Sequence, residues 1–450
     1  MSVRAILLAA GHGTRMKSDL PKMLHLLAGK PLVMHALDAV RGLDEHPMVV
    51  VGHGEDAVRR VVGRAADFVI QEQQLGTGHA VLAAEAQVRG QSDWVLVTYA
   101  DMPLLRPETI ARLVQAQQQS DAVMTMLTVE LPDPHGFGRV VRAEDGRVLA
   151  IVEDAVATPQ QKAIRELNAS VYCFRSEWLW EALHRIQVSP RGEYYLTDVV
   201  EIAVRDGARV QALCTEDVTE AVGINNRLHL AEAEMILRRR INEHWMMEGV
   251  TLLDPATTYI GAEVQIGRDT VLHPNTHLCG KTVIGSGCQI GPNTILESVT
   301  VGNQCTLLAS VAEFAVLEDG VTMGPFCHLR KGAHLGRGVH LGNFGEVKDS
   351  YLAPGVKMGH FSYIGNATIG ENVNIGAGTI TCNYDGQHKH PTTIGADVFL
   401  GSDTMLVAPV TLGEGARTGA GAVVTHDVPP GEVVVGVPAR KLSQKKEAHG

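Results

Sequence analysis

A glycine-rich loop follows the first apolar run of the chain. Residues 3–10 form a short run that is apolar except for Arg4, and Gly11-His12-Gly13-Thr14-Arg15 follows it, with Lys22 a few residues further on. Glycine permits positive φ and a close approach of backbone N–H groups to phosphate oxygens. The stretch is therefore a candidate phosphate-binding loop, although many Gly-x-Gly loops are only turns.

Two further stretches place polar groups just after predicted strands. A strand over 68–71 leads into Gly76-Thr77, where N–H donors at the start of a helix can face a ligand. A strand over 94–99 closes on Asp101, and an acid beyond the carboxyl end of a strand lies at the ligand crevice of an open α/β sheet. Asp101 could equally cap a helix or form a turn, and its position alone leaves the two interpretations about even.

The C-terminal half repeats every six residues. From Ile260 to Leu296 every sixth residue is Ile or Leu, a second register two positions earlier is small or β-branched, and Gly follows the aliphatic at Gly261, Gly267, Gly285 and Gly291. Neither a helix nor a single strand has this period, but a parallel β-helix of short strands does, with glycine allowing the chain to turn each corner. Three faces of six predict about 18 residues and a rise of ~4.8 Å per coil, or roughly ten coils. Seven consecutive hits make chance alternation in a sandwich a poor alternative.

A second set of polar residues interrupts these coils. Arg330, Lys348, His360, Tyr363 and Asn374 stand among small or aliphatic positions, and the stretch 382–391 breaks the period of six. An insertion in a β-helix must project as a loop, and such loops often build binding sites.

The pattern of strands and helices in the sequence predicts that the chain has three segments. Strands alternating with helices over 1–227 favour a doubly wound α/β domain. Leu230, Leu237, Ile241 and Trp245 recur at helical spacing, which predicts one helix over 228–248, about 30 Å long, connecting it to a β-helix domain over 249–450. The triplet 238–240, all Arg, is interpreted as a solvated helix face.

Composition limits the partners. The chain has 450 residues and a net charge of −11, which argues against a general nucleic-acid or membrane-surface binder. Its seven Cys have no zinc-finger spacing and indicate reduced thiols. With neither a signal sequence nor a membrane-spanning stretch expected, the sequence predicts a soluble, cytoplasmic protein.

Specific motifs resemble known families. The string 8–16 with Pro21-Lys22 resembles the signature of sugar-1-phosphate nucleotidyltransferases, and both halves together are similar to the GlmU family. The resemblance implies a uridylyltransferase domain and a left-handed parallel β-helix that carries a glucosamine-1-phosphate N-acetyltransferase. It also implies Mg²⁺, acetyl-CoA and UTP, a homotrimer, and UDP-N-acetylglucosamine as the product, a precursor for peptidoglycan and lipopolysaccharide and so for the cell wall and cell shape.

The same resemblance implies roles for individual residues. Arg15 and Lys22 are suited to stabilising the departing pyrophosphate, and Asp101 and Asn225 match Mg²⁺ ligands. His360 matches the base that deprotonates the sugar amine, and Glu346 could orient it. The uridine nucleotide and its sugar would contact Leu8, Ala9, Ala10, Gly11, Arg15, Lys22, Gln71, Gly76, Thr77, Tyr99, Ala100, Asp101, Gly138, Glu153, Asn168 and Asn225. In the second site, Arg330, Lys348, Tyr363 and Asn374 would bind the sugar phosphate, and Ala377, Asn383, Tyr384, Ser402, Ala420 and Arg440 would bind acetyl-CoA, with Lys389 on the projecting loop.

The sequence departs from the family pattern near the sugar. Ala100 stands where the family often has Gly, and Ala169-Ser170 where it often has Thr-Gly. Both changes are expected to add a side chain near the sugar site.

Alternatives and assembly remain open at this level. The β-helix could serve only for regulation or oligomerisation, or the chain could be a scaffold with a degenerate first domain; His360 with its neighbours, and Asp101 with Asn225 and Lys22, favour two activities. Candidate residues from Arg330 to Ala420 span about five coils, roughly 24 Å, which suggests a site shared between chains. Leu352, Phe361 and Leu406 are expected to pack between prisms.

Overall fold

The protein is described from a computed structural model, which covers residues 2–131, 137–154 and 156–442. It divides into two compact units, residues 1–237 and 238–450, and each is described by itself. The sequence also predicts a glycine-containing turn within the stretch 133–140 that enters a strand, and its residues 133–136 lie outside the described residues.

The first unit is built on one mixed sheet. Its strands run in the order β11-β7-β10-β6-β1-β4-β5, with β8 and β9 attached beside β10. The strands β6, β1, β4 and β5 are parallel to one another, whereas β10 is antiparallel to both of its neighbours. The strands are β1 Val3–Leu8, β4 Met48–Val51, β5 Asp67–Ile70, β6 Trp94–Tyr99, β7 Met124–Glu130, β8 Arg139–Arg142, β9 Val148–Val152, β10 Glu166–Arg175 and β11 Val210–Cys214, with a small hairpin of β2 Leu26–Leu27 and β3 Lys30–Pro31.

Helices cover both faces of this sheet, as the alternating pattern predicts. Residues of β1 point alternately to two cores, Ala5 and Leu7 into one, and Ile6 and Leu8 into the other. The first core packs against α1, α2 and α5, and the second against α3, α7 and α8. The helices are α1 Leu32–Val40, α2 Glu55–Val62, α3 Thr77–Leu82, α4 Glu85–Val88, α5 Pro107–Gln118, α6 Pro159–Lys162, α7 Ser176–Leu183 and α8 Asp198–Arg205. The sequence after Gly76-Thr77 is rich in alanine and predicts one helix through residue 88, but the structure has two helices there, α3 and α4.

The helix α9, Arg227–Met247, lies where the periodicity predicts one over 228–248. The division between the two units falls within it. Its last turns belong to the second unit, where the buried amide of Asn242 donates to the carbonyls of Pro255 and Thr258 at 2.9 and 3.2 Å. Arg238 is not a purely solvated residue, because its guanidinium lies 4.6 Å from the ring centre of Tyr259. No helix among the described residues has both the length and the apolar character that a membrane span requires.

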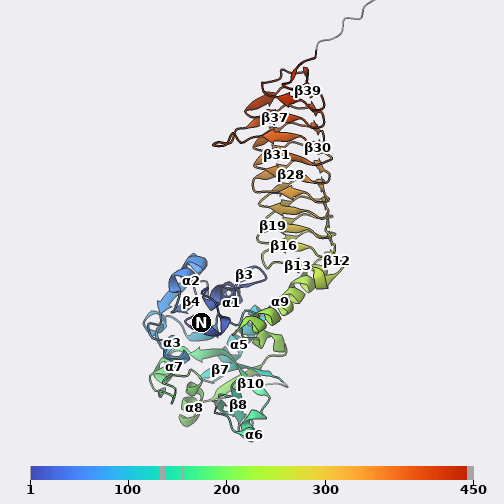
Figure 1. Ribbon diagram of the computed structural model, residues 1–450. Helices are drawn as coiled ribbons and strands as arrows, with labels where there is room; N and C mark the ends of the chain where they lie inside the picture. Colours follow the sequence, from blue (N-terminus) through green and yellow to red (C-terminus); the bar gives the residue numbers. More distant parts are fainter. Residues whose placement is uncertain (1, 132–136, 155, 443–450) are drawn as a thin grey trace, which may run out of the picture. The chain divides into compact units, whose positions relative to one another are not determined.

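The second unit is a coil of short parallel strands (Figure 1, yellow to red). Each strand pairs with its equivalent one coil further on. Leu272 pairs with Ile290, 18 positions later, Ile290 with Leu307 after 17, and Leu307 with Met323 after 16. Coils of 16 to 18 residues explain why the period of six slips and resumes. Ile375 pairs with Leu400 across the insertion, which the coil therefore accommodates as an excursion.

The strands form three faces. Face C contains β12 Thr251–Leu252, β15 Val271–Leu272, β18 Gln289–Ile290, β21 Thr306–Leu307, β24 Thr322–Met323, β27 His340–Leu341, β30 Lys357–Met358, β33 Asn374–Ile375, β36 Phe399–Leu400, β39 Arg417–Thr418, β41 Val433–Val435 and the antiparallel β42 Arg440–Lys441. Face D contains β13 Tyr259–Ile260, β16 His277–Cys279, β19 Ile295–Glu297, β22 Val311–Glu313, β25 His328–Leu329, β28 Gly345–Lys348, β31 Ser362–Gly365, β34 Ile380–Cys382, β37 Met405–Val407 and β40 Val423–Val424. Face E contains β14 Gln265–Ile266, β17 Val283–Ile284, β20 Thr300–Val301, β23 Val316–Leu317, β26 Ala333–Leu335, β29 Ser350–Leu352, β32 Ala367–Ile369, β35 Thr392–Ile394 and β38 Val410–Leu412.

The interior confirms the two registers of the repeat. The Ile and Leu of every sixth position are buried in one continuous core. The small register lies at the corners, where buried threonines bond backbone carbonyls: the Thr270 hydroxyl donates to the Gly285 carbonyl at 2.8 Å and that of Thr282 to the Cys279 carbonyl at 2.7 Å. A β-branched residue with one hydroxyl fills the corner and satisfies a buried acceptor.

The repeated glycines serve a different purpose at some corners than the sequence indicates. Gly267 and Gly285 do not adopt positive φ; instead, a Cβ at either position would lie 2.6 or 2.7 Å from backbone atoms of the next coil. Left-handed backbone occurs at other corner positions, such as Asp269 and Gly287. Close stacking of coils, and not the turn itself, requires glycine at 267 and 285.

This packing predicts that Gly285→Ala destabilises the coil. The new methyl would lie 2.7 Å from the Gly302 carbonyl, so we expect a loss of about 1–3 kcal/mol, measured by thermal or denaturant unfolding. Gly359→Ala is the matched control, because Gly359 also follows an inward aliphatic but has open space around its Cβ position. Equal stability of the two variants would contradict the stacking argument.

Candidate active sites

The loops that follow the parallel strands meet at one edge of the first unit. After β1, the Ala9 amide donates to the Val50 carbonyl at 2.9 Å, and the Ala100 amide after β6 donates to the Leu8 carbonyl at 3.1 Å. The Gln71 amide after β5 donates to the Val51 carbonyl at 2.8 Å. The pairing of parallel strands thus brings the predicted residues at 8–11, 71 and 99–101 together.

Two polar contacts join the predicted cations to the predicted metal ligands. Lys22 Nζ lies 2.5 Å from Asp101 Oδ2, and Arg15 donates from Nη2 to Asn225 Oδ1 at 2.8 Å. The Ile224 amide donates to the Asp101 carbonyl at 2.9 Å, which holds the segment carrying Asn225 beside Asp101. Lys22 is only 9% exposed, so its charge requires the compensation that Asp101 provides.

A second group surrounds the junction after β5. The Gln71 amide group donates to the Gly76 carbonyl and approaches His79 Nδ1, both at 3.0 Å. Thr77 accepts a hydrogen bond from the Leu196 amide at 3.0 Å. Burial raises the pKa of Tyr99, whose phenol also bonds Thr77, so this phenol stays a neutral donor.

The third group is Gly138, Glu153 and Asn168. The Asn168 amide donates to the Gly138 carbonyl at 2.8 Å, and a Cβ on Gly138 would lie 3.7 Å from Glu153 Oε1. Burial raises the pKa of Glu153, which accepts from the Thr197 hydroxyl at 3.5 Å. These three residues therefore converge, as the sequence predicts for nucleotide and sugar contacts.

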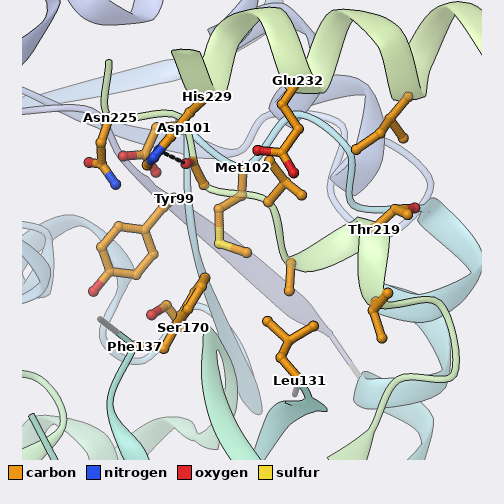
Figure 2. A pocket seen from close by; sticks show the side chains of 15 residues that line it. Tyr99, Asp101, Met102, Leu131, Phe137, Ser170, Thr219, Asn225, His229 and Glu232 are labelled. Carbon is orange, nitrogen blue, oxygen red and sulfur yellow. Dashed lines mark hydrogen bonds between the residues drawn. The ribbon is translucent and has the colours of Figure 1, made fainter. Parts of the chain in front are cut away.

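A cavity of about 390 Å³ opens beside Asp101 and Asn225 (Figure 2). Tyr99, Asp101 and Asn225 lie together at one end, and Thr219 lies at the other. His229, whose Nδ1 lies 3.1 Å from the Gly223 carbonyl, stands beside them. Tyr99, Asp101, Asn225 and Ser170 could be singled out from the sequence. The rest of the lining could not, and it consists of Met102, Leu131, Phe137, Val218, Thr219, Ala221, Val222, Gly223, His229, Glu232 and Ile236. Short segments from five separate regions build this wall, and none carries a motif of its own.

The two departures from the family pattern have different consequences. Ala100 is 0% exposed and packs in the core, so its methyl does not enter the sugar site; that expectation was wrong. Ser170 lines the cavity and has φ of 58°, at a bulge where β10 changes register against β7. A serine in left-handed backbone carries a strain that glycine avoids.

The donor set at Asp101 and Asn225 suits a hard cation only together with a ligand. One carboxylate and one amide supply oxygen, and no group of three or more His, Cys, Asp or Glu that could hold a metal occurs in the described part of the chain. Mg²⁺ is commonly held by one or two protein oxygens with phosphate and water completing six positions, so these residues fit that ion.

In the second unit, four predicted residues share one corner. Each of them follows the glycine that comes directly after a strand of face C, in four successive coils. The four residues are His360, Ala377, Ser402 and Ala420. Backbone bonds join these corners, from the Gly378 amide to the Phe361 carbonyl, from Asp403 to Ala377 and from Gly421 to Ser402, at 2.6–2.8 Å. His360 and three of the residues predicted for acetyl-CoA thus form one column.

The remaining residues lie on other parts of the coil. Arg330, Lys348 and Tyr363 belong to face D or to the corner that follows it, and the Asn383 amide donates there to Asn366 Oδ1 at 2.6 Å. Tyr384 is 62% exposed on the projecting loop. Asn374 lies on face C, and exposed Arg440 lies on β42 at the end of the coil. A single chain therefore divides the predicted set between two corners.

Charges gather at the second corner. Lys389 and Arg330 lower the pKa of Lys348, Lys389 through a direct contact. Arg330 donates to Glu346 at 2.9 Å, so Glu346 is engaged by a cation and does not orient His360 of the same chain. Asp349 Oδ2 lies 3.9 Å from Lys348 Nζ, so two carboxylates, Glu346 and Asp349, balance part of this charge. Three cations close together still exceed the two carboxylates, which favours binding of an anion.

Two of the residues expected to pack between prisms do not. Leu352 and Leu406 are both 0% exposed because they point into the coil. Phe361 is 55% exposed, and Phe326 and Phe344, at 62% and 56%, lie in the same corner column. The rings of Phe326 and Phe344 stack with centroids 5.5 Å apart, which leaves an exposed aromatic edge.

A doubly wound α/β unit with glycine-rich loops at one sheet edge, followed by a hexapeptide coil, defines a nucleotidyltransferase joined to a hexapeptide transferase. Residues 5–169 match the MobA-like NTP transferase domain, and residues 263–298 and 391–426 match the bacterial transferase hexapeptide (six repeats). The predicted fold class, with a left-handed parallel β-helix, is thereby confirmed.

Curated relatives match nearly the whole chain. The "Bifunctional protein GlmU" of Exiguobacterium sibiricum is 46% identical over 94% of this chain and 95% of its own. Proteins of the same name from Heliobacterium modesticaldum and Mycolicibacterium vanbaalenii are 46% and 47% identical over 96% of this chain and 94% and 89% of theirs. The chain belongs to the GlmU family, and the resemblance seen in its sequence is confirmed.

The carboxyl of Asp198, which lies near Glu153, predicts that the stability of the folded protein depends on pH. Burial, with smaller contributions from Glu201 and Glu153, raises the pKa of Asp198 to about 6. The folded state then binds this proton more tightly than the unfolded chain, so stability falls as pH rises from about 4 to about 6.

Asp198→Asn should remove this loss. Because water screens the half-buried carboxyl, we expect a gain of only about 1 kcal/mol above pH 6, shrinking toward pH 4. Thermal unfolding across this range measures it, and a gain independent of pH would contradict the assignment.

Proposed function

We propose that the chain is a bifunctional enzyme that makes UDP-N-acetylglucosamine. Acetyl transfer from acetyl-CoA to glucosamine-1-phosphate comes first, and uridylyl transfer from UTP to the acetylated sugar phosphate follows, with release of pyrophosphate. The observation that carries the proposal is the convergence of Lys22, Asp101, Arg15 and Asn225 at the edge of a nucleotidyltransferase sheet, in a chain that also aligns His360 with a column of small residues. The product supplies peptidoglycan and lipopolysaccharide synthesis.

The uridylyl reaction requires positioning and charge compensation. An oxygen of the sugar phosphate attacks the α-phosphorus of UTP, and the bond from this phosphorus to the bridging oxygen of pyrophosphate breaks. Gln71, Gly76 and Thr77 would orient the nucleotide, and Glu153 and Asn168 the sugar. Lys22 and Arg15 would stabilise the departing pyrophosphate. Mg²⁺ held by Asp101 and Asn225 would neutralise phosphate charge.

The acetyl reaction requires a base. A sugar amine with a pKa near that of an α-amino group, ~7.7–8, is largely protonated at neutral pH and must lose a proton to attack a thioester. His360 accepts that proton as the N–C bond forms, and the C–S bond breaks to release CoA, whose sulfur takes a proton. Arg330 and Lys348 would bind the sugar phosphate with Tyr363 and Asn374, and their crowding of positive charge supports an anion there.

The acetyltransferase site is proposed to form between chains of a cyclic homotrimer. The division of the predicted residues between two corners supports this, as does the exposed aromatic column of Phe326, Phe344 and Phe361. In that assembly His360 and its column face Arg330, Lys348 and Tyr363 of a neighbour. The uridylyltransferase domain is proposed to span 1–227, the connecting helix 228–248 and the acetyltransferase domain 249–450, in a cytoplasmic protein.

Separate variants should remove separate activities. Asp101→Ala is expected to abolish uridylyl transfer and to spare acetyl transfer, while His360→Ala does the reverse, because the two sites lie in different compact units. Pyrophosphate release and CoA release, measured on one preparation, test this. Loss of both activities in either variant, with circular dichroism unchanged, would refute the proposal of independent sites.

Mixed trimers should restore acetyl transfer. His360→Ala and the double variant Arg330→Ala/Lys348→Ala are each expected to be inactive. Coexpressed in equal amounts, they should recover about a quarter of wild-type activity, because a fraction of the interfaces pairs an intact His360 with an intact cation pair.

The control is coexpression of His360→Ala with Asn374→Ala. Asn374 lies on β33, which pairs with β30 just before His360, so its variant should not complement His360→Ala if both residues come from one subunit. Sedimentation velocity establishes the assembly. A monomeric wild-type chain with full acetyltransferase activity would contradict the proposal that the site is shared between chains.

A further inference from the structure

Two Gly-His-Gly segments lie side by side at the edge of the first sheet. Gly11-His12-Gly13 follows β1, and Gly52-His53-Gly54 follows β4. The two strands are direct neighbours, with Leu8 paired to Val50, so their loops leave the sheet together. The phosphate-binding role predicted from the sequence involves only the glycines of the first segment and neither histidine.

The loops are packed closely enough to fix both histidines. A Cβ on Gly52 would lie 2.9 Å from the Ala10 carbonyl, and one on Gly13 would lie 2.7 Å from Lys22 Cβ. Glycine at 52 permits the approach of the two loops, and glycine at 13 permits the approach of the first loop to Lys22. The imidazoles of His12 and His53 consequently lie with ring centres 5.4 Å apart, tilted by 45°.

Both imidazoles are exposed and available to a ligand. Both residues are exposed, and within the described part of the chain the ring of each has only the other's ring as a recorded contact. The nearest acid in sequence, Glu55, lies 3.7 Å from Arg59 on its own helix, which reduces its repulsion of an anion.

Both cations of the first site are already paired, so a triphosphate requires further hydrogen-bond donors, which His12 and His53 can supply. Lys22 is held by Asp101, and Arg15 by Asn225, so both cations lie against the predicted metal ligands. A triphosphate reaching beyond them requires further donors for its terminal oxygens. Imidazole N–H groups donate to phosphate oxygens, more strongly when the ring is protonated.

We propose that His12 and His53 bind the terminal phosphates of UTP, and the pyrophosphate that leaves, as a pair of donors opposite Lys22. This inference rests on the proposed uridylyl transfer and adds to it two phosphate-binding residues and a role for the repeated Gly-His-Gly segment. The two histidines distinguish a triphosphate from a monophosphate, because only the triphosphate reaches them.

The test is binding and kinetics of the full-length protein with Mg²⁺ present. In His12→Ala and His53→Ala the dissociation constant for UTP should rise about tenfold each, as expected for loss of one hydrogen bond to a charged group, while that for UMP stays within about twofold. In the reverse reaction, KM for inorganic pyrophosphate should rise by a similar factor, with KM for UDP-N-acetylglucosamine unchanged.

Two further variants exclude a purely structural effect. His12→Gln keeps an N–H donor and should restore UTP binding to within about threefold. His46→Ala is the matched control, because His46 is exposed and precedes β4, whereas His53 follows it. Its affinity for UTP should equal that of the wild type.

The outcomes separate this inference from the proposed function. Unchanged affinity for UTP in the double variant His12→Ala/His53→Ala, in a protein that still transfers uridylyl groups, would overturn the inference alone. Equal losses for UTP and UMP would overturn it as well, because they indicate disturbed loop packing. A wild-type protein that binds neither nucleotide would overturn the proposed function and this inference with it.

Discussion

Parallel pairing of strands is the constraint on which both sites depend. A parallel ladder aligns the residues that follow each strand, since all carboxyl ends emerge at one edge. In the first unit this edge gathers the loops after β1, β4, β5 and β6, and with them Gln71 and Asp101. In the second unit the same pairing, repeated from coil to coil, aligns His360, Ala377, Ser402 and Ala420 in one column. Backbone pairing therefore brings together residues that are far apart in sequence. Contacts between their side chains are not required for this.

This constraint explains what could be predicted from the sequence. The period of six predicts the coil, its buried Ile and Leu, and the corner threonines, because each follows from local spacing. The end of the strand at Tyr99 matches the predicted one, whereas the apolar run of the first strand continues two residues past Leu8, the last residue of β1. Asp101 could be singled out in the same way, because it follows the strand that ends at Tyr99, whereas the predicted roles of Asn225 and His360 came from the family resemblance.

What could not be predicted depends on how distant segments meet. The pairing of Lys22 with Asp101 joins positions 79 apart, and that of Arg15 with Asn225 joins positions 210 apart. Leu352 and Leu406 read as interface candidates because a one-position change of register along a strand moves a side chain from outside to inside. The expectation for the Ala100 methyl failed for a similar reason, since the residue directly after a buried strand can still belong to the core.

The two sites satisfy their charges in opposite ways. In the first, Lys22 and Arg15 are each matched within the unit, so the pocket is held in shape before a nucleotide arrives, and a further anion must be met by additional donors. In the second, Lys348 stands against Lys389 and Arg330, and its lowered pKa is the cost of that repulsion. Such a cluster gains stability when an anion binds or when a neighbouring chain encloses it. The charges of the first unit are therefore those of a self-contained site, and the excess of positive charge at the second corner is what the proposed shared site requires.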